Sequence, residues 1–293
     1  MIALIIPLAF MPCVIWLIIF YRTKMFRPGP KSLLLRTFII GMFSVLPVLL
    51  FGKLILGDIS MLEPASSMGV SAFRKYILVF FGVGLVEETA KFVSVKLSTS
   101  RSHYIQEPLD GIIYAAAAGL GFAAVENVLY IGQYGMQVVL LRGFLSNLAH
   151  AIFPIYWGFL IGYAALKNWK IPFFLFIGLL ISATAHALFD HFLFEGMIME
   201  FGLLCLLIVV SAIVIIKTAK KMSPYRDNIA QLIGECHICK NRNPASYPHC
   251  TNCGTHLNDH NRQIFCGKCG EETNEKAKFC NSCGSYLLKT NEI

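Results

Sequence analysis

The stretch IPFFLFIGLLISATAHALFDHFLF, residues 171–194, combines a 24-residue apolar run with ionisable side chains near its end. A helix needs about 20 apolar residues to cross a bilayer, so this stretch predicts a transmembrane helix. Charged and titratable groups inside such a helix are costly and face the interior of a bundle. His186 and Asp190 are four residues apart and share one helix face, which indicates a functional site at this position.

The whole chain follows the same apolar pattern. Of its 293 residues, 56% are hydrophobic and 14% are charged, with a mean hydropathy of +0.63. A soluble domain carries about 25% charged residues, so neither a single soluble globule nor a disordered chain fits this composition. We predict an all-α polytopic membrane bundle of about seven transmembrane helices, over residues 2–20, 33–56, 76–95, 110–131, 138–166, 171–194 and 197–216. The first run lacks a preceding basic segment and a cleavage site, which favours a retained span.

Lysine and arginine in the connecting segments predict the orientation, because basic loops stay in the cytoplasm. With the N-terminus outside, the outer segments hold only Lys53, Arg74, Lys75 and Arg142. The inner segments then hold thirteen basic residues: Arg22, Lys24, Arg27, Lys31, Arg36, Lys96, Arg101, Lys167, Lys170, Lys217, Lys220, Lys221 and Arg226. We therefore expect an integral protein of the cell membrane, with its cysteine-rich tail in the reducing cytoplasm.

The tail predicts a small double zinc-ribbon domain. Its eight cysteines form two four-cysteine sets with the same spacing, thirty residues apart: Cys236, Cys239, Cys250 and Cys253, then Cys266, Cys269, Cys280 and Cys283. Four thiolates on two tight turns are a structural zinc site, so we expect two zinc ions. Rubredoxin-like iron has the same ligands, and Cys250 and Cys253 could instead share an ion with Cys266 and Cys269. Glycines 254, 270 and 284 suit the turns.

These features divide the chain into four parts. We predict a transmembrane protease-like domain over residues 1–222, a linker over 223–235, zinc ribbons over 236–286 and a tail over 287–293. The metal replaces a core too small to fold alone, and a cytosolic partner of the ribbons is an additional hypothesis. Residues 217–293 carry 11 basic and 7 acidic side chains without a basic stripe, so we expect no nucleic-acid binding.

Six ionisable residues inside the spans are the candidate site: Glu87, Glu88, Glu126, His150, His186 and Asp190. By helical rise, all six lie near the middle of the membrane or toward its outer side, which predicts one shared polar cavity. Lys91 lies four residues after Glu87 and is expected to be its structural counter-ion, whereas Glu88 has no partner at that spacing. Three remaining carboxylates would then need protons or a divalent cation.

Two backbone features also bear on this cavity. Pro154 cannot donate to the carbonyl of His150, so we expect a kink that frees that carbonyl. Small residues, among them Gly84, Gly119 and Gly121, are predicted to let the spans at 76–95 and 110–131 approach closely.

Four motifs in order resemble the PrsW family of intramembrane proteases: EETAK (87–91), FAAVEN (122–127), SNLAH ending at His150, and HALFD (186–190). The resemblance covers about residues 75–195. It implies a membrane-embedded endopeptidase, usually described as a metalloprotease, whose best-known substrate is a membrane-bound anti-sigma factor, and it places all six residues at the active site. The family is related to the CAAX prenyl endopeptidases, in which the second motif ends in histidine where this chain has Glu126.

The resemblance and the residue types together assign the following roles. Glu87 or Glu88 activates water, and His150 and His186 bind a divalent metal or, without metal, donate to the oxyanion. Asp190 orients His186 from one turn away. Two other classes stay open at this point. One is a non-catalytic scaffold, since the multi-spanning scaffold subunit of γ-secretase is thought to be a distant relative; the other is a proton- or ion-coupled transporter, although the chain shows no internal repeat of its membrane half.

Overall fold

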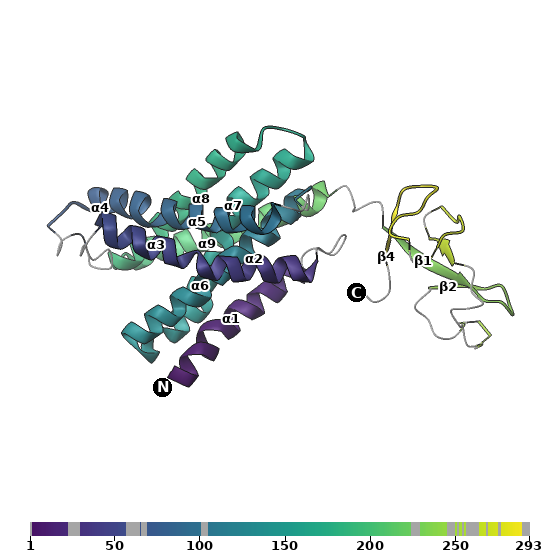
Figure 1. Cartoon of the computed structure of the whole chain (residues 1–293), viewed down its shortest axis with the longest axis horizontal. Coiled ribbons are helices and arrows are strands. Elements are labelled where there is room, and N and C mark those ends of the chain that lie inside the picture. Colours follow the sequence, from purple (N-terminus) through teal and green to yellow (C-terminus); the bar gives the residue numbers. More distant parts are fainter. Residues whose placement is uncertain are drawn as a thin grey trace. The chain divides into compact units, whose positions relative to one another are not determined.

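The structure, a computed structural model, describes residues 2–22, 30–56, 65, 69–100, 105–223, 229–244, 250, 252–253, 255, 264–267, 269–274 and 277–288. Within these residues the chain forms two compact units that divide after Met222. The first unit is helical, and the second is a small β-sheet unit that contains the cysteine sets (Figure 1).

The first unit is the predicted all-α membrane bundle. Its helical segments in order are α1 (Ile2–Arg22), α2 (Lys31–Phe43), α3 (Val45–Phe51), η1 (Gly52–Leu56), α4 (Ala72–Val79), η2 (Phe80–Gly84), α5 (Leu85–Thr99), α6 (Pro108–Tyr134), η3 (Met136–Val138), η4 (Leu141–Ser146), α7 (Asn147–Leu166), α8 (Ile171–Phe194) and α9 (Ile198–Met222). The turns η1, η2 and η4 are π-helical. Six stretches among the described residues are long and apolar enough to cross a membrane. The continuous helix of α4, η2 and α5 is long enough as well, but it carries the charged residues of the candidate site.

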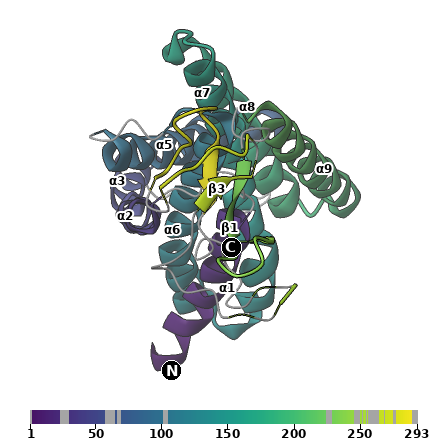
Figure 2. The same ribbon diagram turned by 90° about the vertical axis from the view of Figure 1, so that its right-hand side faces the viewer.

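Helix α6 forms the centre of the bundle, where it contacts α1, α2, α5, α7 and α9. Figure 2 shows α9 on one flank of this unit and α2, α3 and α5 on the opposite flank. The helix begins with Pro108 and a capping box between Glu107 and Asp110, which satisfies its free N-terminal amides. It ends at Gly135, whose φ of 76° suits glycine.

Small residues bring the backbones together, but against other helices than we predicted. Gly121 packs on the carbonyl of Phe38 in α2, and Gly119 packs on the carbonyl of His150 in α7. A Cβ on Gly84 would lie 2.7 Å from the Ala183 carbonyl oxygen in α8. Each of these glycines therefore permits a backbone contact that any side chain would block.

Pro154 lies inside α7, as the sequence requires, and removes the amide that would bond the His150 carbonyl. The freed carbonyl lies against Gly119. This close approach places His150 beside the middle of α6, next to the Phe122 ring at 5.8 Å between ring centroids.

The second unit joins the two ribbons through one strand. Strand β1 (Ile229–Glu235) pairs antiparallel with β2 (Arg242–Pro244) and β3 (Ile264–Cys266), and parallel with β4 (Tyr286–Leu288). Residues 229–235, which the sequence analysis assigns to the linker, thus form the central strand of this sheet. Residues 287 and 288, assigned to the tail, belong to β4.

The cysteines form the two linear sets, so the alternative pairing of Cys250 and Cys253 with Cys266 and Cys269 is wrong. Sulfur atoms in both sets lie 3.5–3.7 Å apart, close to the edge of about 3.8 Å expected for tetrahedral zinc with 2.3 Å bonds. A hydrogen bond with the Ser285 hydroxyl lowers the pKa of the Cys283 thiol to about 6, which favours the metal-binding thiolate.

Tight turns follow three of the four knuckles. Gly270 and Gly284 have φ values of 75° and 68°, and Lys240 takes the same left-handed conformation with a φ of 58°. Glycine is therefore used at the predicted positions 270 and 284, while Gly254 lies outside the described residues.

Candidate active site

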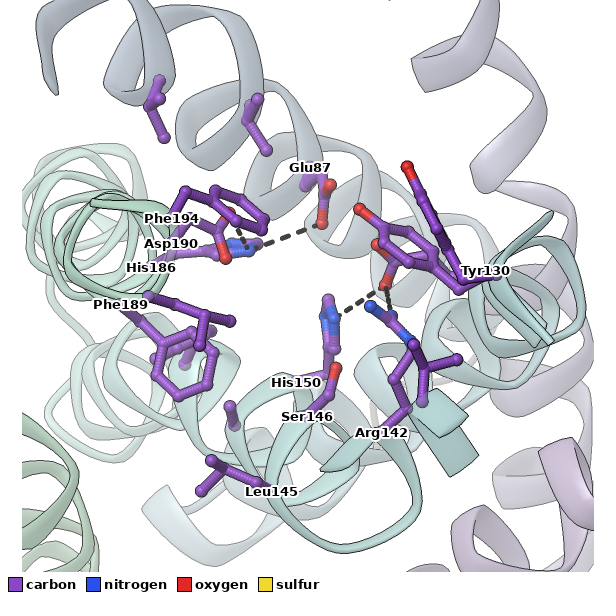
Figure 3. Close-up of a pocket in the computed structure, with 18 residues that line it drawn as sticks. Glu87, Tyr130, Arg142, Leu145, Ser146, His150, His186, Phe189, Asp190 and Phe194 are labelled. Atoms are coloured by element: carbon purple, nitrogen blue, oxygen red, sulfur yellow. Dashed lines mark ion pairs between the residues drawn. The ribbon is translucent and has the colours of Figure 1, made fainter. Parts of the chain in front are cut away.

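A pocket of about 420 Å³ lies at one end of the bundle, between the segments η2 and α5, the end of α6, the segments η4 and α7, and the end of α8. Figure 3 shows side chains from these four regions pointing toward one another around it. Its charged and imidazole side chains are Glu87, Glu126, Arg142, His150, His186 and Asp190. Five of the six predicted site residues therefore line one pocket, and the sixth, Glu88, lies directly behind it.

His186 stands between three carboxyl groups. Its Nε2 lies 3.7 Å from Glu87 Oε2 and 3.6 Å from Asp190 Oδ2. Its Nδ1 lies 3.3 Å from Glu88 Oε1, and the ring stacks on Phe153 with the centroids 4.7 Å apart. The carboxylate that faces the second ring nitrogen is thus Glu88, whereas the sequence analysis gave the orienting role to Asp190.

Glu88 is completely enclosed by protein. Lys91 Nζ donates to its Oε1 at 2.7 Å, and Trp157 Nε1 and Ser182 Oγ donate to its Oε2 at 3.1 and 2.8 Å. Glu88 has no partner four residues away, as predicted, but Lys91 is three residues away and pairs with it. Both carboxylate oxygens of Glu88 thus accept hydrogen bonds behind the pocket, whereas its neighbour Glu87 lines the pocket.

His150 is held at both ring nitrogens. Nδ1 lies 3.1 Å from Lys91 Nζ, and Nε2 lies 2.8 Å from Glu126 Oε2. Lys91 also lies 3.5 Å from Glu87 Oε2, so it is a shared counter-ion and not the dedicated partner of Glu87. An ammonium group can only donate, so it fixes Nδ1 as the acceptor and leaves the proton of the neutral ring on Nε2.

A divalent metal fits the donor set of this pocket. Ligand atoms of Glu87, His150 and His186 lie within 4.8 Å of one another. Glu87 Oε2 is buried, lies 3.5 Å from Lys91 Nζ and accepts no hydrogen bond from the described residues, which leaves this oxygen available to a ligand. His150 Nε2 would have to lose the proton that faces Glu126 before it could act as a ligand, and binding of metal commonly releases protons in this way.

Sequence reasoning missed two residues of the site. Arg142 was counted only as a basic residue of an outer segment, and it lies 2.8 Å from Glu126. Trp157 was not singled out, although its position seven residues after His150 places both on one face of α7. An arginine at the end of an apolar run and a tryptophan on a histidine face are the signals that could have revealed them.

Carboxylates and imidazoles around one buried pocket in a membrane bundle are typical of a membrane-embedded hydrolase. Comparison with known proteins defines the kind: the family described as PrsW family intramembrane metalloprotease matches residues 29–216, and the chain belongs to that family. The family described as Double zinc ribbon matches residues 236–284. The chain is thus an intramembrane protease of the metalloprotease type with two structural zinc sites.

Curated relatives agree with this assignment. The chain is 29% identical over 182 residues to Protease PrsW of Geobacillus kaustophilus, covering 62% of this chain and 76% of the relative. It is 31% identical over 173 residues to Protease PrsW of Shouchella clausii, covering 59% and 75%. It is 28% identical over 175 residues to Protease PrsW of Bacillus subtilis, covering 59% and 75%. No solved structure matches.

Proposed function

We propose that the chain is an endopeptidase that hydrolyses a peptide bond of a membrane protein near the extracytoplasmic face. The observation that supports this most directly is that the Glu87 carboxylate and the two imidazoles, His150 and His186, bring their ligand atoms within 4.8 Å of one another in one pocket. A carboxylate poised beside a bound water is a familiar general base for amide hydrolysis.

Glu87 is the proposed base, and Glu88 is the proposed positioning residue. Glu87 lines the pocket, and its Oε2 accepts no hydrogen bond from the described residues, so it can take a proton from water or bind the metal that carries the water. Glu88 has both oxygens engaged behind the pocket. It faces His186 Nδ1 and would hold that ring with Nε2 directed to the pocket, as second-shell carboxylates do in metal sites.

Glu87, His150 and His186 would hold the metal, with Asp190 next to His186 as a further oxygen donor. A divalent metal at this position would lower the pKa of a bound water and polarise the scissile carbonyl. In a metal-free mechanism, the same imidazoles would donate to the oxyanion of the tetrahedral intermediate. In this metal-free mechanism Glu87 would receive the proton of the water and pass it to the leaving amine.

The proposed orientation puts the N-terminus outside and the ribbons in the cytoplasm. The pocket lies where α6 and α8 end and where the segment of η4 and α7 begins, and on this topology that end is extracytoplasmic. A reporter that works only in the cytoplasm should be active when it is fused after Met222. A reporter that works only outside the cell membrane should be inactive at the same position. An exported reporter that is active there would overturn the orientation and the placement of cleavage.

A membrane-bound anti-sigma factor is one candidate for the substrate, and any single-span protein with a site near the outer face serves for a test. The experiment measures cleavage of such a protein by the purified full chain in proteoliposomes. We expect Glu87→Gln to abolish cleavage and Glu88→Gln to reduce it about 10- to 100-fold, as loss of an orienting partner does. Glu200→Gln is the matched control, because Glu200 is an exposed carboxylate on α9 outside the pocket. Full cleavage by Glu87→Gln would refute the proposed base.

Metal analysis separates the two mechanisms. The intact chain should contain two ribbon zinc ions and one further ion, and the double variant His150→Ala, His186→Ala should lose only the further ion. If the wild type and the double variant both contain only the two ribbon zinc ions, the result would favour the metal-free glutamate mechanism. Ribbon zinc serves as the internal standard, because its eight ligands belong to the other compact unit.

A further inference from the structure

Arg142 belongs to no recognised motif, yet it is the pocket's own cation. It lies in the π-helical turn η4 that leads into α7, and its side chain is only 11% exposed. Its Nη2 lies 2.8 Å from Glu126 Oε2. An arginine so far from water and beside the proposed active site calls for a specific role.

Three neighbours fix the pose of this guanidinium. Its Nε donates to Asn127 Oδ1 at 2.8 Å, and its Cζ lies 3.8 Å from the centroid of the Tyr130 ring. Asn127 in turn donates to Asn147 Oδ1 at 2.7 Å, which sets the direction of the Asn127 amide. The planar group is thus held by a hydrogen bond, an aromatic face and an ion pair, and it has one geometry in which all three are made.

Arg142 and His150 both lie within ion-pair distance of the same carboxylate oxygen. Glu126 Oε2 lies 2.8 Å from Arg142 Nη2 and 2.8 Å from His150 Nε2. Glu126 is 15% exposed and shares the pocket with the carboxylates of Glu87 and Asp190. Without a cation at its side, repulsion from these carboxylates would turn Glu126 away from His150.

We propose that Arg142 is a positioning residue of the protease site, which clamps Glu126 onto His150 and so sets the direction of the imidazole. This inference rests on the proposed function for its catalytic consequence, but the clamp itself is a property of the structure. Lys91 holds His150 at Nδ1 and the clamp holds it at Nε2, so the loss of Arg142 leaves the ring fixed at one nitrogen only.

The shape of arginine matters as well as its charge. Nε and Nη2 contact two different partners, Asn127 and Glu126, which a single ammonium cannot do at the same time. Arg142→Lys should therefore give a rate between those of the wild type and Arg142→Gln. Wild-type turnover by Arg142→Lys would show that charge alone is enough and would overturn the clamp.

The kinetic test uses the full chain and a single-span substrate in proteoliposomes. For Arg142→Gln we expect kcat to fall about 10- to 100-fold with KM nearly unchanged. The double variant Arg142→Gln, Glu126→Gln should be no slower than Glu126→Gln, because Arg142 acts through Glu126. Arg74→Gln, an exposed basic residue at the start of α4, is the control. A raised KM at normal kcat would assign Arg142 to substrate binding instead, and losses that multiply would also overturn the proposal.

A second readout does not depend on proteolysis. Diethyl pyrocarbonate modifies accessible imidazole nitrogens, and peptide mass spectrometry follows His150 and His186 separately in the full chain. We expect His150 to be modified several times faster in Arg142→Gln and in Glu126→Gln, with His186 unchanged and with thermal unfolding close to that of the wild type. Unchanged protection of His150, or faster modification of both histidines together with a lower Tm, would overturn the clamp. If the substrate is not cleaved by any variant, the proposed function fails while this measurement still decides the clamp.

Discussion

Replacing Gly84 by alanine tests how strictly the contact between η2 and α8 sets the geometry of the site. The added Cβ would lie 2.7 Å from the Ala183 carbonyl oxygen and 3.4 Å from the Ala187 amide nitrogen. The first contact is with backbone, so no side chain can move aside to accommodate it. Glu87 lies three residues after Gly84, and His186 lies three residues after Ala183. A displacement of the backbone at the contact will therefore also displace these two site residues.

The size of the effect follows from the distances. An ordinary contact is 3.4 Å or longer, so full relief moves the two helices apart by about 0.7 Å. A misplacement of 1 Å can cost about 100-fold in rate. By the same scale, a displacement of about 0.7 Å lowers the rate about 25-fold, which corresponds to about 1.9 kcal/mol of activation free energy.

Stability should change less than activity. Overpacking costs about 1–3 kcal/mol, but alanine gains about 1 kcal/mol over glycine within a helix. We therefore expect kcat to fall about 25-fold while the protein still accumulates in the membrane with a Tm only slightly lowered. Gly202→Ala is the matched control, because a Cβ there meets no atom of the described residues within 4 Å. A well-folded Gly84→Ala protein that cleaves at the wild-type rate would refute the reasoning.

Three further predictions concern the environment of the site and the ribbons. Trp157→Phe removes the donor 3.1 Å from Glu88 Oε2 and should lower the free energy of unfolding by about 1 kcal/mol, measured as a fall in Tm in detergent; an unchanged Tm would mean that Ser182 alone satisfies this oxygen. Lys91→Met leaves Glu88 buried without its cation and should cost about 3–5 kcal/mol. Adding Glu88→Gln should restore part of the loss, and a further loss instead would contradict the pairing. Cys250→Ser should reduce ribbon zinc from two ions to one by mass spectrometry, since the sets are separate; loss of both ions would mean that β1 couples the two ribbons.

Periodicity and spacing were enough for the elements of the fold. Apolar runs of about 20 residues can only be satisfied in lipid as helices, because every backbone group must find its partner within the segment. The position of Pro154 likewise predicted which carbonyl α7 would leave free. Cysteine spacing predicted two metal sites, because each pair of thiolates comes from one tight turn and only local geometry is involved.

The pairing of elements was harder to predict. A glycine shows that some backbone approaches closely, but it does not say which one, and Gly84, Gly119 and Gly121 each met a different helix from the one expected. The strand β1 was assigned to a linker, but it pairs with β2 of the first ribbon and also with β3 and β4 of the second ribbon, far along the chain. Such long-range contacts leave no periodic mark in the sequence.

The sequence by itself determined that this protein is a membrane bundle with a zinc-ribbon unit, and which six ionisable residues gather around one pocket. Their chemical types and helical spacing carry that information, because burying charge in lipid is too costly without a purpose. Only the tertiary structure decided that Glu87 faces the pocket while Glu88 turns behind it, that Lys91 serves Glu88 first, and that Arg142 completes the site. Adjacent residues differ by about 100° around a helix, so the packing of the neighbouring helices determines which of them meets the pocket.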